Sequence, residues 1–172
     1  MPSYITSIRL ATVEDAPVIA HIVNTAWKTA YAGIVPQSYL DTLDDIPRVQ
    51  RLVEGLERFP DLRYYLFEEN GVPVGAASLH PTHDEDLADT SEFTFFYFLP
   101  SIWRLGYGSM LLDRLKADSR SLGFHQICCW VLEENLRAIA FYESQGMLRD
   151  GSRQTVTIGE PLEAVRCVAP LK

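Results

Sequence analysis

Two glycines and an arginine separate an aromatic segment from a leucine-rich one in the chain. Arg104, Gly106 and Gly108 follow residues 96–99 and precede residues 110–122. Where a strand turns directly into a helix, several backbone N–H groups point at one spot, and glycines let an anion approach them. The helix end and the arginine add positive charge, so the pattern predicts a site for phosphate or pyrophosphate. A tight strand–helix turn that binds nothing explains an isolated Gly-x-Gly about equally well.

The same turn lacks the marks of two other nucleotide-binding motifs. No Gly-Lys-Ser/Thr follows it, as in a P-loop, and no third glycine completes a dinucleotide fingerprint. A phosphate held here therefore indicates a different class of site.

Three residues in a later part of the chain share one face of an expected helix. Asn135, Ala138 and Tyr142 lie at positions i, i+3 and i+7, so they can contact one ligand. Asn135 also stands where a side chain caps the first helical turn. Tyr142 can equally pack in the core with its hydroxyl bonded internally.

Two other groups have both a functional and a structural interpretation. Trp27 and Tyr31, four apart on the first expected helix, form one aromatic surface that suits either a ligand or the core. Residues 80–86 contain two histidines and three carboxylates, which suits a metal ion. No spaced cysteine or second histidine pair supports that site, so we interpret 80–86 as a solvated acidic loop and expect no metal.

These groups must be positioned by a mixed set of strands and helices. Aromatic or alternating residues predict strands at 5–10, 63–68, 72–79, 92–99, 126–132, 155–158 and 164–168. Apolar residues at helical spacing predict a helix that ends near residue 30 and helices over 44–59, 108–122 and 135–145. Hairpins and strand–helix–strand crossovers together imply an α/β fold, a mixed sheet with helices on both faces.

Composition limits the classes of protein to which the chain can belong. At 172 residues and 47% hydrophobic it can bury one core, and we expect a single domain over 1–172. The net charge of −8 argues against nucleic-acid binding and mildly favours a cationic small molecule or basic peptide as partner. No long apolar run predicts a membrane span, and the first residues lack a signal-peptide pattern, so we expect no membrane partner and a cytoplasmic location. Three cysteines, an odd count, predict reduced thiols, with Cys128 and Cys129 on opposite sheet faces.

Two segments, in the right order, resemble a known superfamily. Residues 96–112 resemble the coenzyme A loop of the GNAT superfamily of acyl-CoA-dependent N-acyltransferases. Residues 131–147 resemble its later motif, Asn-x-x-Ala-x-x-Phe-Tyr-Glu-x-x-Gly-Phe. Residues 26–36 are similar to a common bacterial branch, so the resemblance covers most of the chain.

The sequence departs from the superfamily pattern at two places. The loop is usually written Gln/Arg-x-x-Gly-x-Gly/Ala, but Trp103 takes the first position here and Arg104 follows it. Met147 replaces the usual Phe, a conservative apolar exchange. Because backbone groups hold most of the phosphate in the family, the first departure bears on the contact of Arg104 rather than on the cofactor.

The resemblance implies a fold, a cofactor and a set of contacts. The fold is a mixed, mostly antiparallel sheet of about seven strands that splays between the fourth and fifth, with about four helices on both faces. The co-substrate is acetyl-CoA or a longer acyl-CoA, whose pantetheine arm pairs with the backbone of the strand before the loop. The implied cofactor-binding residues are Phe96, Tyr97, Phe98, Trp103, Arg104, Leu105, Gly106, Tyr107, Gly108, Ser109, Asn135, Ala138 and Tyr142.

The resemblance also implies catalytic roles. An amine that attacks a thioester expels a thiolate, and a phenol of pKa ~10 can protonate a leaving thiol of pKa ~8.5, a role that falls on Tyr142. The attacking ammonium must first lose a proton, so Glu92 is the expected base, directly or through water, with a solvated carboxylate as the structural alternative. Backbone N–H groups of the splayed strand would polarise the carbonyl. Trp27 and Tyr31 would contact the acceptor.

We therefore expect an N-acetyltransferase that transfers an acetyl group to a primary amine, of a small molecule or a peptide, by direct attack. Two alternatives stay open: a non-catalytic acyl-CoA-binding sensor, and a loop that binds another nucleotide phosphate. The residues do not select the acceptor, because one architecture serves many amines through changes in its loops. Exposed strands at the C-terminal end are consistent with a homodimer.

Overall fold

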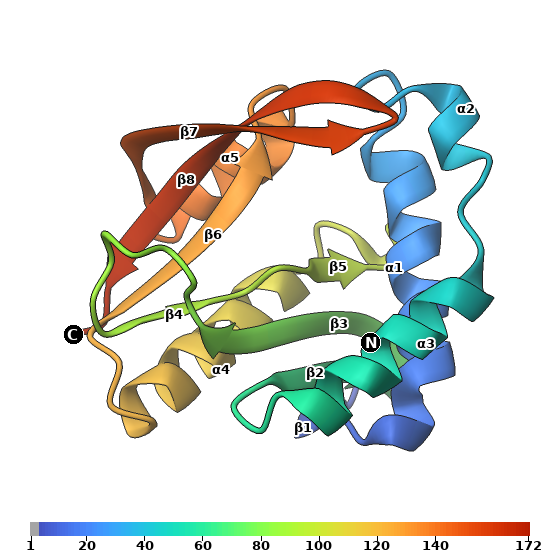
Figure 1. Ribbon diagram of the computed structural model, residues 1–172. Helices are drawn as coiled ribbons and strands as arrows, with labels where there is room; N and C mark the ends of the chain where they lie inside the picture. The colour runs from blue at the N-terminus through green and yellow to red at the C-terminus, as the bar shows by residue number, and fades with distance from the viewer. Residues whose placement is uncertain (1–3) are drawn as a thin grey trace.

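The computed structural model describes residues 4–172 as a twisted sheet with helices packed on it (Figure 1). The strands are β1 (Thr6–Leu10), β2 (Arg63–Glu69), β3 (Val72–Pro81), β4 (Thr90–Glu92), β5 (Phe96–Phe98), β6 (Gln126–Leu132), β7 (Leu148–Ile158) and β8 (Glu160–Pro170). The helices are α1 (Ala16–Ala30), α2 (Gln37–Leu40), α3 (Asp45–Arg58), α4 (Tyr107–Ser121) and α5 (Leu136–Ser144). The predicted α/β class and the order of its elements are confirmed.

The sheet is mixed and mostly antiparallel. Its strand order is β1-β2-β3-β4-β6-β8-β7, and β5 pairs only with β3. Among the named strands of residues 4–172, β4 and β6 form the parallel pair. The sheet therefore has eight strands instead of seven, because the strand predicted over 92–99 is divided into β4 and β5.

The division follows from a hydroxyl group on the neighbouring strand. Ser78 of β3 accepts hydrogen bonds at Oγ from the backbone N–H groups of Thr94 (2.9 Å) and Phe95 (3.2 Å). The Ser78 N–H in turn donates to the Phe95 carbonyl at 3.0 Å. The chain turns away from β6 after Phe93, whose N–H still donates to the Cys128 carbonyl at 3.2 Å. The predicted splay between 92–99 and 126–132 is thus present, and it opens at residues 93–95.

Helices cover the sheet on both faces (Figure 1). On one face, α4 and α5 contribute Leu111, Leu112, Leu115 and Ile139 to a core that also holds Phe67 and Met147. On the other face, α1 and α3 contribute Ile19, Ile22 and Leu52 to a second core. Both cores are formed by the helical stripes that the sequence predicts. No helix within residues 4–172 has the length and apolar character needed to cross a bilayer.

The acidic loop after β3 is anchored rather than solvated. Arg166 of β8 has a side chain only 4% exposed, and it forms ion pairs with Asp84 (2.9 Å), Asp86 (2.5 Å) and Asp150 (2.7 Å). The interpretation of 80–86 as a solvated loop is therefore wrong for Asp84, whose side chain is 24% exposed, whereas Asp86 is ion-paired but 64% exposed. They neutralise a buried cation that lies 80 residues further along the chain.

Gly75 of β3 supports the short strand that borders the opening. A Cβ atom at this position would lie 2.3 Å from the ring of Phe98, which is buried at the end of β5. We expect Gly75→Ala to lower the free energy of unfolding by ~1–3 kcal/mol, because the ring must leave its place. Urea denaturation measures this. The exposed substitution Lys28→Ala on α1 is the control and should change stability by less than ~0.5 kcal/mol; equal effects of the two changes contradict the prediction.

Candidate functional site

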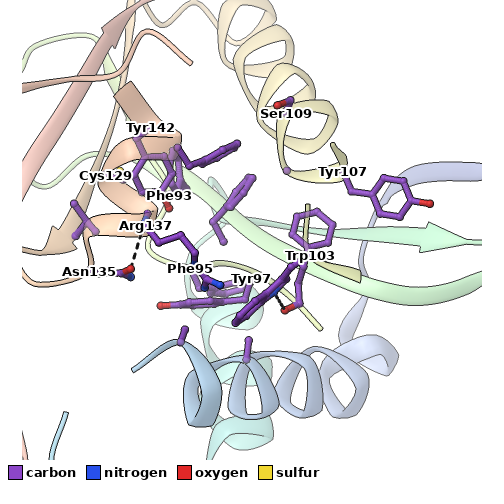
Figure 2. Close-up of a pocket in the computed structure, with 18 of the residues that line it drawn as sticks. Phe93, Phe95, Tyr97, Trp103, Tyr107, Ser109, Cys129, Asn135, Arg137 and Tyr142 are labelled. Atoms are coloured by element: carbon purple, nitrogen blue, oxygen red, sulfur yellow. Dashed lines mark hydrogen bonds between the residues drawn. The ribbon is translucent and has the colours of Figure 1, made fainter. Parts of the chain in front are cut away.

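A cavity of about 340 Å³ opens where β5 diverges from β6 (Figure 2). Its walls come from α1, residues 93–98, the segment before α4, β6 and the start of α5. Most of the site residues predicted from the sequence line it. They are Tyr31, Phe96, Tyr97, Phe98, Trp103, Arg104, Gly106, Tyr107, Gly108, Ser109, Asn135, Ala138 and Tyr142. Trp27, Leu105 and Glu92 do not belong to the lining.

The segment before α4 and the first turn of that helix line this cavity. Arg104 and Gly106 have positive φ angles of 68° and 82°, which turn the chain sharply into the helix. The first backbone bond of α4 runs from Met110 N to Gly106 O at 3.4 Å, so the N–H groups of residues 107–109 precede the helical ladder. A helix N-terminus with free N–H groups favours a bound anion.

Two contacts hold this turn in place. The Trp103 indole donates from Nε1 to the Phe98 carbonyl at 2.9 Å, which fastens the turn to the end of β5. A Cβ atom at Gly108 would lie 3.1 Å from Cζ of Phe141, so a small residue is needed where α4 approaches α5. Each glycine of the sequence pattern therefore has a geometric reason. Gly106 adopts a left-handed backbone conformation, and Gly108 packs closely against Phe141.

Among residues 4–172, one edge of β5 has no strand partner. Phe96, Tyr97 and Phe98 pair with Ala77, Ala76 and Gly75 of β3. The opposite edge faces the cavity, beyond which lies β6 (Figure 1). An extended ligand can add to such an edge through main-chain hydrogen bonds, as a further strand does.

Tyr142 lies in the cavity wall on α5 and is 8% exposed. Its ring packs against Phe93, with ring centroids 5.6 Å apart, and against Phe96 at 6.4 Å. Burial, reinforced by the neighbouring Cys129, raises the pKa of Tyr142 well above its ordinary value. The phenol therefore keeps its proton at neutral pH. It can donate that proton when a sufficiently strong base forms beside it.

Asn135 has the capping role that its position predicts. Its Oδ1 accepts a hydrogen bond from the Ala138 N–H at 3.2 Å and so closes the first turn of α5. Asn135 also lines the cavity, as do Ala138 and Tyr142 on the same helical face. The cap and a ligand contact are thus compatible.

The aromatic residues of α1 form one cluster with β5. The hydroxyl groups of Tyr31 and Tyr97 lie 2.7 Å apart, and burial raises the pKa of both phenols. The Trp27 ring stacks edge-on against Tyr31 at 4.7 Å between centroids, while the Arg48 guanidinium lies 5.7 Å from it. Tyr31 therefore reaches the cavity directly, and Trp27 supports it from behind.

Glu92 does not belong to the lining of the cavity, and it lies with Thr82 and Cys128 instead. Its side chain is buried on β4, 8% exposed, and Oε2 accepts a hydrogen bond from Thr82 at 2.8 Å. Cys128 lies next to it, and burial together with the charge of Glu92 raises the pKa of that thiol to about 12. The alternative of a solvated carboxylate is wrong, because the loop after β3 covers Glu92. Its expected role as a base stays a prediction.

The three cysteines are free and buried, as expected for reduced thiols. Cys129 lines the cavity, and Cys128 contacts Thr82 on the opposite face of β6. The expected alternation of the two neighbouring side chains is confirmed.

Several residues of the lining were not among the predicted site residues. They are Ala26, Ala30, Phe93, Thr94, Phe95, Ile102, Cys129, Trp130, Val131, Arg137 and Phe141. Arg137 is the charged one, and its guanidinium carbon lies 3.6 Å above the Trp103 ring. It stands two residues after Asn135 inside the later motif, but no pattern in the sequence says that it reaches across to Trp103.

The sequence of this chain matches a known protein family. Residues 22–147 match the family model described as acetyltransferase (GNAT) family. The chain belongs to this family. A curated relative, the uncharacterized N-acetyltransferase YuaI of Bacillus subtilis (strain 168), is 28% identical over 142 residues, which cover 80% of this chain and 78% of the relative.

Solved structures of GNAT proteins share the fold. One is the PaiA N-acetyltransferase of Thermoplasma acidophilum, solved in complex with coenzyme A. It matches with a TM-score of 0.78 at 18% identity, and the match covers 96% of this chain and 99% of the PaiA chain. The putative acetyltransferase yncA of Salmonella typhimurium, solved with its cofactor acetyl-CoA, has a TM-score of 0.72 at 23% identity, with coverages of 98% and 95%. The splayed sheet of this chain is therefore the GNAT fold.

Proposed function

We propose that the protein transfers an acetyl group from acetyl-CoA to a primary amine by direct attack. One observation carries the proposal: in a chain of the GNAT family, a single cavity connects the free N–H groups before α4 with the buried phenol of Tyr142. An anion site and a proton donor on one cavity are what a phosphate-bearing thioester requires.

The cofactor would be held by three parts of the site. The N–H groups of residues 107–109 and the Arg104 side chain would receive the pyrophosphate. The free edge of β5 would pair with the amide groups of the pantetheine arm, as an added strand does. Asn135 and Ala138 would contact the same arm from α5, because both line the cavity.

The reaction moves three protons: one leaves the ammonium before attack, one goes to the departing sulfur, and one leaves the nitrogen as the tetrahedral intermediate collapses and replaces the proton that Tyr142 gives up. The amine nitrogen bonds to the thioester carbonyl carbon, and the C–S bond then breaks as the tetrahedral oxyanion collapses. N–H groups on the free edge of β5 would stabilise that oxyanion, and Tyr142 would donate its proton to the departing sulfur. The ammonium proton must leave first, and we propose that Glu92 accepts it through water, because its carboxylate lies outside the cavity lining.

The acceptor would approach from the side of α1. Ala26, Ala30 and Tyr31 form the cavity wall there, and the two alanines add little bulk to it. This supports an enzyme over the alternative, an acyl-CoA sensor whose acceptor groove is blocked.

The proposal is tested by the release of thiol from acetyl-CoA in the presence of single amines. For at least one class of primary amine, we expect thiol release to exceed the rate without amine. The amine product should be heavier by about 42 Da, the mass added when an acetyl group replaces a hydrogen. Binding of acetyl-CoA without release from any amine would favour the sensor. Binding of ATP or NAD as tightly as acetyl-CoA would favour a general phosphate site.

A further inference from the structure

The charged side chains of the cavity all carry the same sign. Among residues 4–172, Arg104 and Arg137 are the charged residues of the lining, and it contains no aspartate, glutamate, lysine or histidine. This contrasts with the net charge of −8 of the whole chain. The part of the site that meets the ligands is therefore cationic, although the protein is acidic.

Arg137 comes from α5 and contacts the turn that precedes α4. It projects from the start of α5 across the cavity toward Phe95 and Tyr97 (Figure 2). Its guanidinium lies 3.6 Å above the Trp103 ring, and the Trp103 indole is itself held by the Phe98 carbonyl at 2.9 Å. Stacking of this kind orients the guanidinium while leaving its N–H groups free to donate.

Within the described chain, no carboxylate offsets this cation. Arg137 forms no ion pair among residues 4–172, and its pKa is lowered by burial and then by the charge of Arg104. Its other electrostatic neighbour is the phenol of Tyr31, on the α1 wall of the cavity. Arg137 is exposed, so its N–H groups are open to solvent and to an anionic group supplied by a ligand.

The walls around Arg137 are apolar and flat. Phe95, Tyr97 and Trp130 line the cavity with rings, while Ala26 and Ala30 of α1 leave space between them. Rings and small side chains suit an aromatic or aliphatic group. A polyamine would instead bring several positive charges against Arg137 with no carboxylate to receive them.

We propose that the acceptor is an amine that carries both an apolar body and a carboxylate, and that Arg137 binds this carboxylate. The inference rests on the proposed function and names its substrate class. It departs from the cationic acceptor that the net charge alone favours, because the acceptor meets the lining and not the average surface. The phosphates of the cofactor are a second source of negative charge, which the test must separate from the first.

Matched acceptors test the substrate class. Phenylalanine and 4-aminomethylbenzoate place the carboxylate near to and far from the amine, and phenylalaninamide and 4-aminomethylbenzamide are their neutral counterparts. We expect kcat/KM for at least one carboxylate to exceed that of its amide by about tenfold or more, the effect of one charge-assisted hydrogen bond. Turnover of hexylamine or spermidine without this preference overturns the inference and leaves the proposed function standing. No binding of acetyl-CoA overturns the proposed function itself.

Two arginine variants test the residue. Arg137→Gln should raise KM for the preferred carboxylate acceptor about tenfold and abolish its advantage over the amide, with the Kd of acetyl-CoA changed less than twofold. Arg104→Gln should do the reverse, weakening acetyl-CoA without changing the acceptor preference. Arg120→Gln, an exposed change in the last turn of α4, is the control for both. If Arg137→Gln weakens acetyl-CoA as much as Arg104→Gln does, the guanidinium serves the cofactor phosphates and the inference is wrong.

Discussion

Tyr142→Phe should lower kcat by ~10²–10⁴-fold, the range measured when a general acid is removed, while the Kd of acetyl-CoA stays within about twofold. The substitution takes away one oxygen and leaves the ring in its place among Phe93, Phe96 and Phe141. Packing and the cofactor channel are thereby preserved, and the proton for the departing sulfur is lost. Steady-state kinetics and a calorimetric titration separate the two effects.

The pH dependence follows from the direction of the pKa shift. Burial raises the pKa of Tyr142 above its usual value of ~10, so the phenol remains protonated over the whole range from neutral pH to about pH 10. Loss of an acid through ionisation should therefore not reduce kcat at alkaline pH below that limit. A decline of kcat between pH 8 and 9 would contradict the assignment.

Tyr64→Phe is the matched control for this substitution. Tyr64 is also a buried tyrosine whose pKa is raised by burial, but it belongs to the core between the sheet, α1 and α3. It does not line the cavity. We expect Tyr64→Phe to leave kcat unchanged within about twofold, so an equal loss in both variants would point to general damage.

Gly106→Val should weaken acetyl-CoA binding by about 100-fold. The backbone of Gly106 has φ of 82°, a conformation that a β-branched residue adopts only with strain. The chain would relax by turning residues 104–108, which misaligns the N–H groups that face the anion. Loss of one or two charge-assisted hydrogen bonds, at ~1.5–3 kcal/mol each, corresponds to this change in Kd.

Gly123→Val is the matched control, because it introduces the same backbone strain at a position away from the proposed anion site. Gly123 lies just beyond α4 with φ of 91°, and no atom lies within 4 Å of a Cβ built there, as at Gly106. Both variants should lose stability to a similar extent. Only Gly106→Val should lose acetyl-CoA, and a comparable loss of affinity in Gly123→Val would show that strain in α4, rather than the anion site, is responsible.

Local patterns in the sequence predict much of the fold and site. The helical stripes of α1, α3 and α4 and the cap at Asn135 depend on residues a few positions apart, so spacing alone identifies them. The two glycines before α4 were recognised for the same reason. Trp103 and Ser109 were named because the resemblance of residues 96–112 to the superfamily loop implies them.

Features that depend on distant partners were not predicted. The break between β4 and β5 requires the hydroxyl of Ser78, which lies 16 residues before Thr94. Glu92 stays outside the cavity lining although the next residue, Phe93, belongs to it, because successive side chains of a strand point to opposite faces. The run of aromatic residues over 92–99 suggested one continuous strand and did not show where the strand divides.

Two arginines show the same limit for charged residues. Arg166 lies in a segment that predicts a strand, yet only the three-dimensional structure brings it to Asp84 and Asp86. Arg137 precedes Ala138 in a recognised motif. Its contact is with Trp103, however, and positions 103 and 137 are 34 residues apart in the sequence. Sequence spacing carries no information about such pairs.

The central claim is that the turn before α4 and the free edge of β5 bind an acyl-CoA. Its most direct test is a calorimetric titration of the protein with acetyl-CoA, run beside ATP and NAD under the same conditions. We predict a single site that binds acetyl-CoA at least about tenfold more tightly than either nucleotide, because only acetyl-CoA has a pantetheine arm to pair with β5. Equal affinity for all three, or no binding of acetyl-CoA, would contradict this account.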